Sequence, residues 1–231
     1  MRRPFLISMV DFTKYPLPRI RHHTNPNFYL PYDSFRVKPK NYPPLIKEIN
    51  WKKIFLNGKS PNSLDVGCGI GKFLLEFALQ NKNENILGFE VRQKAADWIN
   101  NVIDSENIKN AGALWFSVAS GIKFIADESI EKIFYFFPDP WFKKKHHKRR
   151  ALTIKLIAEF RRVLKPKGKI YTMTDVSEID EFQLELFLTR KKFKQELTDE
   201  TKWNLNARSN QEEFCLNKKI RILHRIFSKI N

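Results

Sequence analysis

The sequence contains little cysteine: only Cys68 and Cys215 among 231 residues. Their spacing fits neither a disulfide framework nor a cysteine metal site, so we expect a reducing compartment. No apolar run approaches the roughly 20 residues that a membrane-spanning helix needs. The start, MRRPFLISMVDFTKYP, is interrupted by Asp11 and Lys14 before any small-residue cleavage site, and predicts no secretory signal. We therefore expect a cytoplasmic protein, with an organelle as the alternative.

Acidic residues are also scarce relative to basic ones. The chain has 25 Asp and Glu against 42 Lys and Arg, which gives a formal net charge of +17. A positive field of this size favours a polyanionic partner, either nucleic acid or an acidic membrane surface, over a mere role in solubility. With 42% hydrophobic and 29% charged residues, the composition is that of a globular protein, and the length suits one core with appendages.

The first 60 residues differ in character from the rest. Most of the 12 prolines lie at or before Pro61, and segments such as RIRHHTNPNFYLPYDSFRVKPKNYPP have no sustained period. This pattern predicts an extended basic arm over 1–60, with at most one short helix around Leu45–Phe55. Two interpretations stay open, that the arm grips RNA or that it wraps over the core. Residues 61–231 form the predicted main domain.

From Ser63 onward, short apolar runs alternate with longer amphipathic ones. The predicted strands are SLDV, ILGF, ALWF, KIFYFF and KIYTMT, and the tail IRILHRIFSKI is a candidate for a last strand. The predicted helices are KFLLEFALQ, QKAADWINNVI, TIKLIAEFRRVL and EIDEFQLELFL. This alternation predicts an α/β fold with a doubly wound, mostly parallel sheet and ligands at the carboxyl ends of its strands.

The segment LDVGCGIGKF predicts a cofactor site. Gly67, Gly69 and Gly71 are spaced G-x-G-x-G, one residue tighter than the dinucleotide fingerprint, and Asp65 closes the strand before them. An acid beside this turn suits a cationic ligand such as the sulfonium and ammonium groups of S-adenosylmethionine. Glu90 ends the next strand, where a carboxylate can accept ribose hydroxyls. An ordinary tight turn and a nicotinamide oxidoreductase are the alternatives.

The fourth strand ends in Pro138-Asp139-Pro140-Trp141, followed by the basic run KKKHHKRR. The two prolines that flank Asp139 prevent this segment from continuing as a helix or as a hydrogen-bonded strand. We therefore expect Asp139 to be held rigidly at the edge of the sheet where chemistry takes place. The basic run could draw a phosphate backbone beside it, and Trp141 or Phe142 could stack on an unstacked base. The alternative is a solvated charged loop. Adjacent histidines among cations are poor ligands, so we expect no metal.

The run FFPDPWFKKKHHKRR closely resembles the signature of the tRNA (guanine-N7-)-methyltransferase family. The resemblance includes DVGCGIG and GFEVR and continues through YTMTDVSE and SNQEEFCLNK. RIRHHTNP is similar to an amino-terminal segment of cyanobacterial and plastid members. The resemblance implies a Rossmann-like class I methyltransferase fold and S-adenosylmethionine as cofactor. It also implies methylation at N7 of the variable-loop guanosine, position 46, of tRNA.

The resemblance also implies roles for individual residues. Those implied for the cofactor are Asp65, Gly67, Gly69, Glu90, Val118 and Asp139, with Asp139 also the catalytic acid. Those implied for the guanosine are Lys143, Asp175, Ser209 and Glu212. The family usually has Asp or Asn where this chain has Val118, so adenine recognition there would use backbone groups. For the RNA backbone we expect Lys144, Lys145, Lys148 and Arg149.

Three other functions stay open at this point. A methyltransferase of another RNA or of a protein would share the cofactor half, and so would a non-catalytic RNA-binding protein on the same scaffold. A nicotinamide oxidoreductase would share the strand order and Glu90. The sequence predicts tRNA as partner, no membrane and no metal, and slightly favours a monomer.

Overall fold

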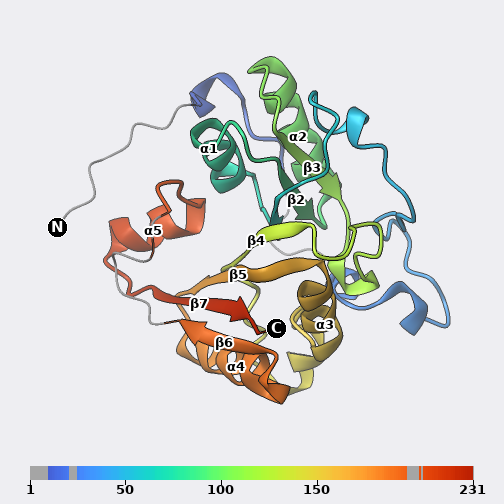
Figure 1. The fold of residues 1–231 in the computed structure, drawn as a ribbon, viewed down its shortest axis with the longest axis vertical. Helices are drawn as coiled ribbons and strands as arrows, with labels where there is room; N and C mark the ends of the chain where they lie inside the picture. Colours follow the sequence, from blue (N-terminus) through green and yellow to red (C-terminus); the bar gives the residue numbers. More distant parts are fainter. Residues whose placement is uncertain (1–9, 21–24, 197–202, 204, 231) are drawn as a thin grey trace.

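A computed structural model describes residues 10–20, 25–196, 203 and 205–230, and it contains a seven-stranded sheet in the order β3-β2-β1-β4-β5-β7-β6 (Figure 1). The strands are β1 Ser63–Val66, β2 Ile86–Glu90, β3 Ala111–Trp115, β4 Ile130–Phe136, β5 Leu164–Thr174, β6 Phe193–Glu196 and β7 Leu223–Lys229. The α-helices are α1 Lys72–Gln80, α2 Gln93–Ser105, α3 Ile154–Val163, α4 Ser177–Leu188 and α5 Asn210–Lys218. Short 3-10 turns are η1 Phe12–Lys14, η2 Pro26–Tyr29, η3 Tyr32–Ser34, η4 Trp51–Lys53, η5 Val118–Ser120, η6 Lys144–Arg149 and η7 Thr189–Lys191.

The sheet is parallel from β3 to β5 and ends in an antiparallel pair. β1 pairs in parallel with both β2 and β4, so the strand order reverses direction at β1. β7 runs antiparallel to β5 and to β6. The predicted doubly wound, mostly parallel sheet is therefore confirmed, and the tail is its antiparallel strand. Sheets of this type bind ligands where the strand order reverses, which in this sheet is between β1 and β4.

Two hydrophobic cores form because alternate residues of each buried strand point to opposite faces. On β4, Phe134 and Phe136 pack with Phe73 of α1 and with the apolar face of α2. Ile133 and Tyr135 point the other way, into the core that α3 and α4 cover. Layers of helices on both faces leave the strand ends as the place where functional loops can gather.

All five predicted internal strands and all four predicted helices are present, with ends that shift by a few residues. The prediction missed two elements, β6 and α5. β6 has four residues, of which only Phe193 is buried, so its apolar alternation is too short to recognise. α5 is polar over most of its surface and leaves Phe214 and Leu216 half exposed, so it lacks a clear apolar stripe.

The described part of the arm contains 3-10 turns and no α-helix or strand, and η4 is the short helical turn that falls within 45–55. It packs on the main domain: Val10 is 2% exposed in the core under α1 and α2, and the indole of Trp98 donates to the Pro16 carbonyl. This part of the arm therefore wraps the core. The start of the chain and residues 21–24 of RIRHHTNP lie outside the described residues, and the division at residue 60 stays a prediction.

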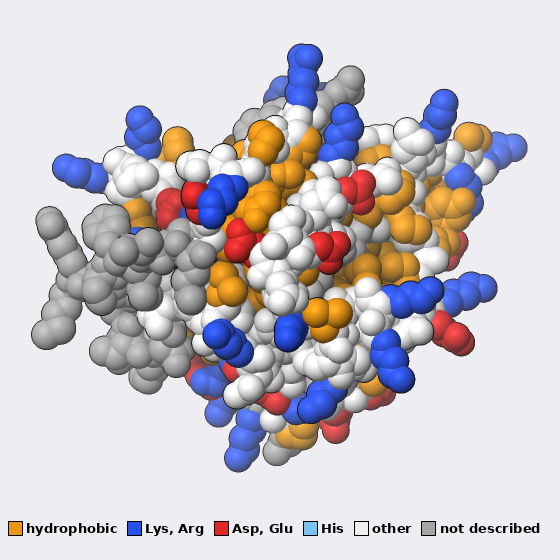
Figure 2. Space-filling view, turned by 90° about the horizontal axis from the view of Figure 1, so that it is seen from above, with side chains coloured by type: hydrophobic (Ala, Val, Ile, Leu, Met, Phe, Trp, Pro, Cys, Tyr) orange, Lys and Arg blue, Asp and Glu red, His pale blue; other side chains and the backbone are white. Residues whose placement is uncertain are grey.

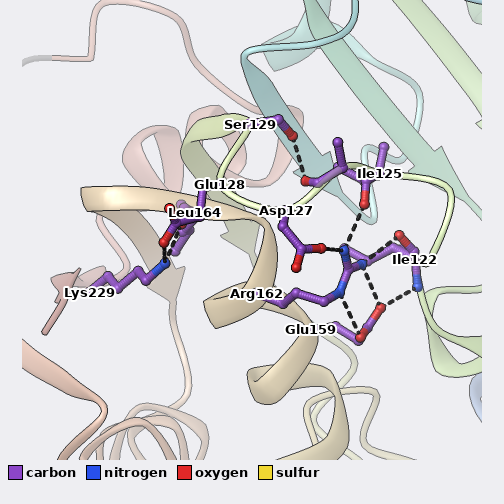
Figure 3. Close-up of polar contacts among 10 residues, drawn as sticks. Ile122, Ile125, Asp127, Glu128, Ser129, Glu159, Arg162, Leu164 and Lys229 are labelled. Carbon is purple, nitrogen blue, oxygen red and sulfur yellow. Dashed lines mark hydrogen bonds and ion pairs between the residues drawn. The ribbon is translucent and has the colours of Figure 1, made fainter. Parts of the chain in front are cut away.

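A polar network fixes the amino end of β4, away from the edge where ligands are expected (Figure 3). Arg162 at the end of α3 donates to Asp127, Glu159 and the carbonyls of Ile122 and Ile125. Lys229 of β7 reaches across to Glu128 and the Leu164 carbonyl. The connection from η5 to β4 is thereby tied to α3 and β7. None of the helices in the described ranges is long and apolar enough to cross a bilayer.

Candidate active site

The parallel strands β2, β1, β4 and β5 bring the predicted acids to the same edge of the sheet. Asp65 on β1 lies opposite Phe134 on β4, and Phe136 near the end of β4 lies opposite Met173 on β5. The segments after these strands therefore emerge side by side. They are the glycine turn, the Pro138–Trp141 turn and the loop that begins at Asp175.

The glycine turn is a cradle that only glycine forms without strain. Gly67, Gly69 and Gly71 have φ angles of 82°, 62° and 75°, all in the left-handed region. A Cβ on Gly71 would lie 2.7 Å from Cγ1 of Ile99, so α1 and α2 approach closely there. Above Gly67, in contrast, no atom of the described residues lies within 4 Å of where a Cβ would be. The turn thus leaves open space for a ligand against its backbone.

Asp65 has the electrostatics of a site for a cation. The side chain is 3% exposed, and its Oδ2 has no hydrogen-bond partner among the described residues. Burial raises the pKa of this carboxyl to about 8, and the nearby charge of Glu90 adds to the shift. A buried acid with an unsatisfied oxygen is stabilised by an incoming ammonium or sulfonium group. The chemistry of the donor set therefore fits S-adenosylmethionine.

Glu90 is buried at 4% exposure and is bound by its own loop. Arg92 donates from its backbone nitrogen (2.9 Å) and Nε (2.8 Å) to Oε1, and from its terminal nitrogen to Oε2 (3.1 Å). The carboxylate is thereby held at the end of β2 with lone pairs left for further donors. Val118 lies buried in η5, next to the end of β3.

The Asp139 turn is anchored on both sides. Phe137 and Trp141 have φ angles of 45° and 46°, in the left-handed region that costs most residues energy. The Phe137 nitrogen donates to the Met173 carbonyl at 2.7 Å, and Nε of Arg150 donates to the Pro140 carbonyl at 3.1 Å. Asp139 itself is exposed, and its Oδ2 accepts a 2.6 Å hydrogen bond from the Tyr29 hydroxyl.

Three of the four residues predicted for the guanosine lie at or beside the start of α5, whereas the fourth, Lys143, belongs to the basic loop. Gln211 donates to Oδ2 of Asp175 at 3.3 Å, and the thiol of Cys215 lies 3.7 Å from the same oxygen. Ser209 is the N-cap of α5, because its hydroxyl accepts from the Glu212 nitrogen. Glu212 is 7% exposed. Asp175 and α5 are therefore in contact. The Ser209 hydroxyl already accepts a hydrogen bond as the N-cap of α5.

The basic run divides into exposed and anchored residues. Four lysines of the run are exposed: Lys143, Lys144, Lys145 and Lys148. The Arg149 guanidinium lies 5.2 Å from the Trp141 ring centre. Arg150 is 7% exposed and pairs with Glu178 of α4, so it holds the loop rather than facing solvent. Figure 2 shows Lys and Arg side chains around the rim of the molecule, where Asp and Glu are fewer.

The two aromatic residues of the turn also differ. Trp141 is half-buried, with Tyr29 and His146 edge-on to its ring at 5.9 Å each. Phe142 is 65% exposed. Of the two predicted stacking residues, Phe142 is therefore the one whose ring is accessible.

The sequence interpretation missed four residues that build this site. Tyr29 and Arg92 bind the predicted acids, Arg150 anchors the basic loop, and Lys72 pairs with Glu76 and Glu213. The G-F-E-V-R order could have suggested Arg92, because a cation two residues after a buried acid is within reach of it. No local pattern separates Tyr29 from the other aromatic residues of the arm.

Comparisons with known proteins identify the family of this chain. The family model described as "Putative methyltransferase" matches residues 59–223. A tRNA (guanine-N(7)-)-methyltransferase of Prochlorococcus marinus strain MIT 9515 is 31% identical over 91% of this chain and 100% of its own length. A second, from Prochlorococcus marinus subsp. pastoris, is 34% identical with the same coverage. A relative of the same name from Brugia malayi is 33% identical over 70% of this chain and 63% of its own length.

Among solved structures, the 16S rRNA methyltransferase KamB aligns with a TM-score of 0.53 at 12% identity, over 74% of this chain and 87% of that one. This likeness concerns the fold alone, and it agrees with the class I methyltransferase architecture. The sequence matches carry the family assignment. The chain belongs to the family of S-adenosylmethionine-dependent tRNA (guanine-N7-)-methyltransferases.

Proposed function

We propose that this protein transfers the methyl group of S-adenosylmethionine to N7 of guanosine 46 in the variable loop of tRNA. The observation that carries the proposal is the pairing of β1 with β4. Because these two strands are neighbours, the glycine turn after β1 lies beside the Asp139 turn and the basic loop after β4. The glycine turn is open, and Oδ2 of Asp65 next to it lacks a hydrogen-bond partner among the described residues. A cationic methyl donor and a polyanionic acceptor would thus meet at one edge of the sheet.

The cofactor would be held by two acids and the glycine turn. Asp65 would stabilise its positive charge, and Gly67 and Gly69 would let it approach the backbone. Glu90 would accept the ribose hydroxyls while Arg92 keeps its carboxylate in place. Backbone groups around Val118 would contact the adenine. When bound, S-adenosylmethionine supplies an electrophilic methyl group on a sulfonium.

The guanosine would be held by carboxylates. Guanine N7 has a lone pair and no proton, so this chain needs no general base, and alignment of the reacting atoms dominates. Asp139 and Asp175 would accept hydrogen bonds from the guanine edge, with Glu212 nearby. As positive charge develops on the purine, these bonds strengthen, which lowers the barrier. Lys143 would contact the same nucleoside, and Ser209 would act through the end of α5 that it caps.

The remaining basic side chains would hold the tRNA. Lys144, Lys145, Lys148 and Arg149 would contact phosphates, and Phe142 would stack on an unstacked base. A loop nucleotide is easier to extrude than a paired one, which suits the variable loop. We further propose that the protein acts in the cytoplasm of a bacterium or in a plastid, since relatives at about 30% identity come from cyanobacteria.

The test is mass spectrometry of nucleosides from a tRNA transcript incubated with protein and methyl donor. We expect N7-methylguanosine, and its loss when guanosine 46 is changed to adenosine. Undiminished labelling of the changed transcript would point to another RNA site. Labelling of protein in place of tRNA, or binding of NAD without binding of S-adenosylmethionine, would reject the proposal.

A further inference from the structure

Tyr29 of the arm reaches the active turn although 110 residues separate it from Asp139 in the sequence. Its hydroxyl donates to Oδ2 of Asp139 at 2.6 Å, and its ring lies edge-on to Trp141, with 5.9 Å between ring centres. Both contacts fall on the turn that carries the proposed catalytic acid. Through Tyr29, the arm therefore contacts the proposed catalytic acid directly.

The backbone on either side of Tyr29 is anchored to the segment that follows β3, directly at Phe28 and through Tyr42 at Leu30. The Phe28 carbonyl accepts a 2.5 Å hydrogen bond from the Ser117 hydroxyl. The Leu30 carbonyl accepts a 2.6 Å bond from the hydroxyl of Tyr42, which is 8% exposed and bonds Ser120 in turn. Because the backbone is anchored at the residues before and after it, Tyr29 has little backbone freedom, and its ring packs against Trp141. Tyr29 is therefore a rigid donor rather than a loose surface contact.

The hydroxyl of Tyr29 remains protonated while it donates. Burial raises the pKa of this phenol, and the neighbouring Asp139 raises it further. A permanent donor on one carboxylate oxygen fixes the rotamer of the acid. Oδ1 of Asp139 has no partner among the residues that the structure describes, so the two oxygens have different environments.

We propose that Tyr29 is a positioning residue that holds Oδ2 of Asp139 so that Oδ1 faces the guanine edge; this rests on the function proposed above. The hydrogen bond from guanine strengthens only as charge develops on the purine, so the orientation of the acceptor affects the transition state more than ground-state binding. Without the Tyr29 hydroxyl, the Asp139 carboxylate samples other rotamers. A smaller fraction of the protein molecules then has Asp139 in the orientation that methyl transfer needs.

The variant Tyr29→Phe keeps the ring against Trp141 and removes only the donor. With saturating tRNA and S-adenosylmethionine, we expect the single-turnover rate to fall about tenfold, while the Kd values of tRNA and cofactor stay within about twofold of wild type. The matched control is Tyr32→Phe in the same arm, whose hydroxyl has no hydrogen-bond partner in the described part of the chain. It should methylate at the wild-type rate.

A double-mutant cycle separates positioning from a merely structural role. In an Asp139→Ala background, Tyr29→Phe should have no further effect on the rate, because the group it positions is gone. Equal losses in both backgrounds, a wild-type rate for Tyr29→Phe, or a faster one would each overturn the proposal. If wild-type protein forms no N7-methylguanosine, the proposed function fails. If it forms the product and Tyr29→Phe is unimpaired, only the role of Tyr29 fails.

Discussion

The ammonium group of Lys72, the first residue of α1, lies 3.1 Å from Oε1 of Glu213 in α5. Lys72 also pairs with Glu76 within α1, and the second oxygen of Glu76 accepts from the Arg208 nitrogen at 3.0 Å. These contacts join the helix that starts at the glycine turn to the helix that begins beside Asp175. The proposed cofactor site, beside α1, and the proposed guanosine site, beside α5, are therefore joined by one ionic cluster.

The members of this cluster should contribute unequally to stability. Lys72→Met leaves the carboxylate of Glu76 buried without its cation, which should cost about 3–5 kcal/mol in free energy of unfolding. Glu213→Gln should cost less than about 1 kcal/mol, because the Glu213 side chain is 42% exposed. Urea denaturation measures both. Adding Glu76→Gln to Lys72→Met should recover most of the loss, and equal costs for the two single variants would contradict the assignment.

Binding of the cofactor should release a proton near neutral pH. The pKa of Asp65 is raised to about 8, so the carboxyl is mostly protonated at pH 7, and a bound cation favours its ionised form. Affinity for S-adenosylmethionine should therefore rise from pH 6 to pH 8 and level off above. Calorimetry in buffers of different ionisation enthalpy should detect close to one proton released. Asp65→Asn should abolish that release as well as weaken binding.

The same raised pKa has a consequence for the unliganded protein. The folded-state pKa lies above that of the unfolded chain, so folding takes up a proton between about pH 4 and pH 8 and stability falls as pH rises through that window. Asp65→Asn should then stabilise the free protein more at pH 8 than at pH 5. A pH-independent difference between variant and wild type would show that Asp65 titrates normally.

Glu90→Gln should weaken the binding of S-adenosylmethionine at least tenfold, since a hydrogen bond to a charged acceptor contributes about 1.5–3 kcal/mol. The variant also leaves Arg92 without its anionic partner. The matched control is Glu131→Gln, which removes a surface pair with Lys165 at the amino end of β4. It should bind the cofactor normally. Equal affinity for the two variants would remove Glu90 from the proposed ribose site.

Asp139→Asn should lose most single-turnover methyl transfer while it keeps nearly normal affinity for tRNA. The substitution removes a charge that stabilises the developing cation, and it removes no phosphate contact. Gel-shift titration and rapid-quench assays at saturating cofactor measure the two quantities separately. A wild-type rate would mean that Asp139 is only a turn residue.

Neutralising four cations of the basic loop should have the opposite effect: weaker tRNA binding with methyl transfer retained at saturating tRNA. Changing Lys144, Lys145, Lys148 and Arg149 to Gln should weaken tRNA binding at moderate salt. Each lost phosphate contact should flatten the dependence of log affinity on log salt by about 0.7 to 0.9. The control changes the same number of exposed lysines near the amino ends of the strands, namely Lys52, Lys53, Lys59 and Lys82. If both quadruple variants lower the salt slope equally, the loop acts through net charge alone.

The sequence predicted the sheet well because parallel buried strands are continuous apolar runs, as in KIFYFF and ILGF. It also predicted an acid near the carboxyl end of three strands: Asp65 lies within β1, Glu90 is the last residue of β2, and Asp139 comes three residues after β4. Asp175, directly after β5, was implied only by the family resemblance. Gly67, Gly69 and Gly71 were recognisable from their G-x-G-x-G spacing. All three have left-handed φ angles, which glycine adopts without strain.

What the sequence did not predict depends on long-range contacts. Nothing in KKKHHKRR distinguishes Arg150, buried against Glu178, from its exposed neighbours. Tyr29 bonds Asp139 only because the arm is attached to Ser117 and Ser120, far away in the chain. β6 is stabilised by its pairing with β7 rather than by its own pattern. Tertiary contacts outweigh weak local preferences in these segments.

The span of the Tyr29–Asp139 and Arg208–Glu76 hydrogen bonds, 110 and 132 residues, has a consequence for folding. Contacts of such high sequence separation close large loops, whereas the β1–α1–β2 unit forms from near neighbours. The central sheet should therefore form before the arm and α5 dock onto it. Native-state hydrogen exchange should find the amides of η2 and α5 opening at lower free energy than those of β4. Mild denaturant should accordingly abolish methylation before the sheet itself unfolds.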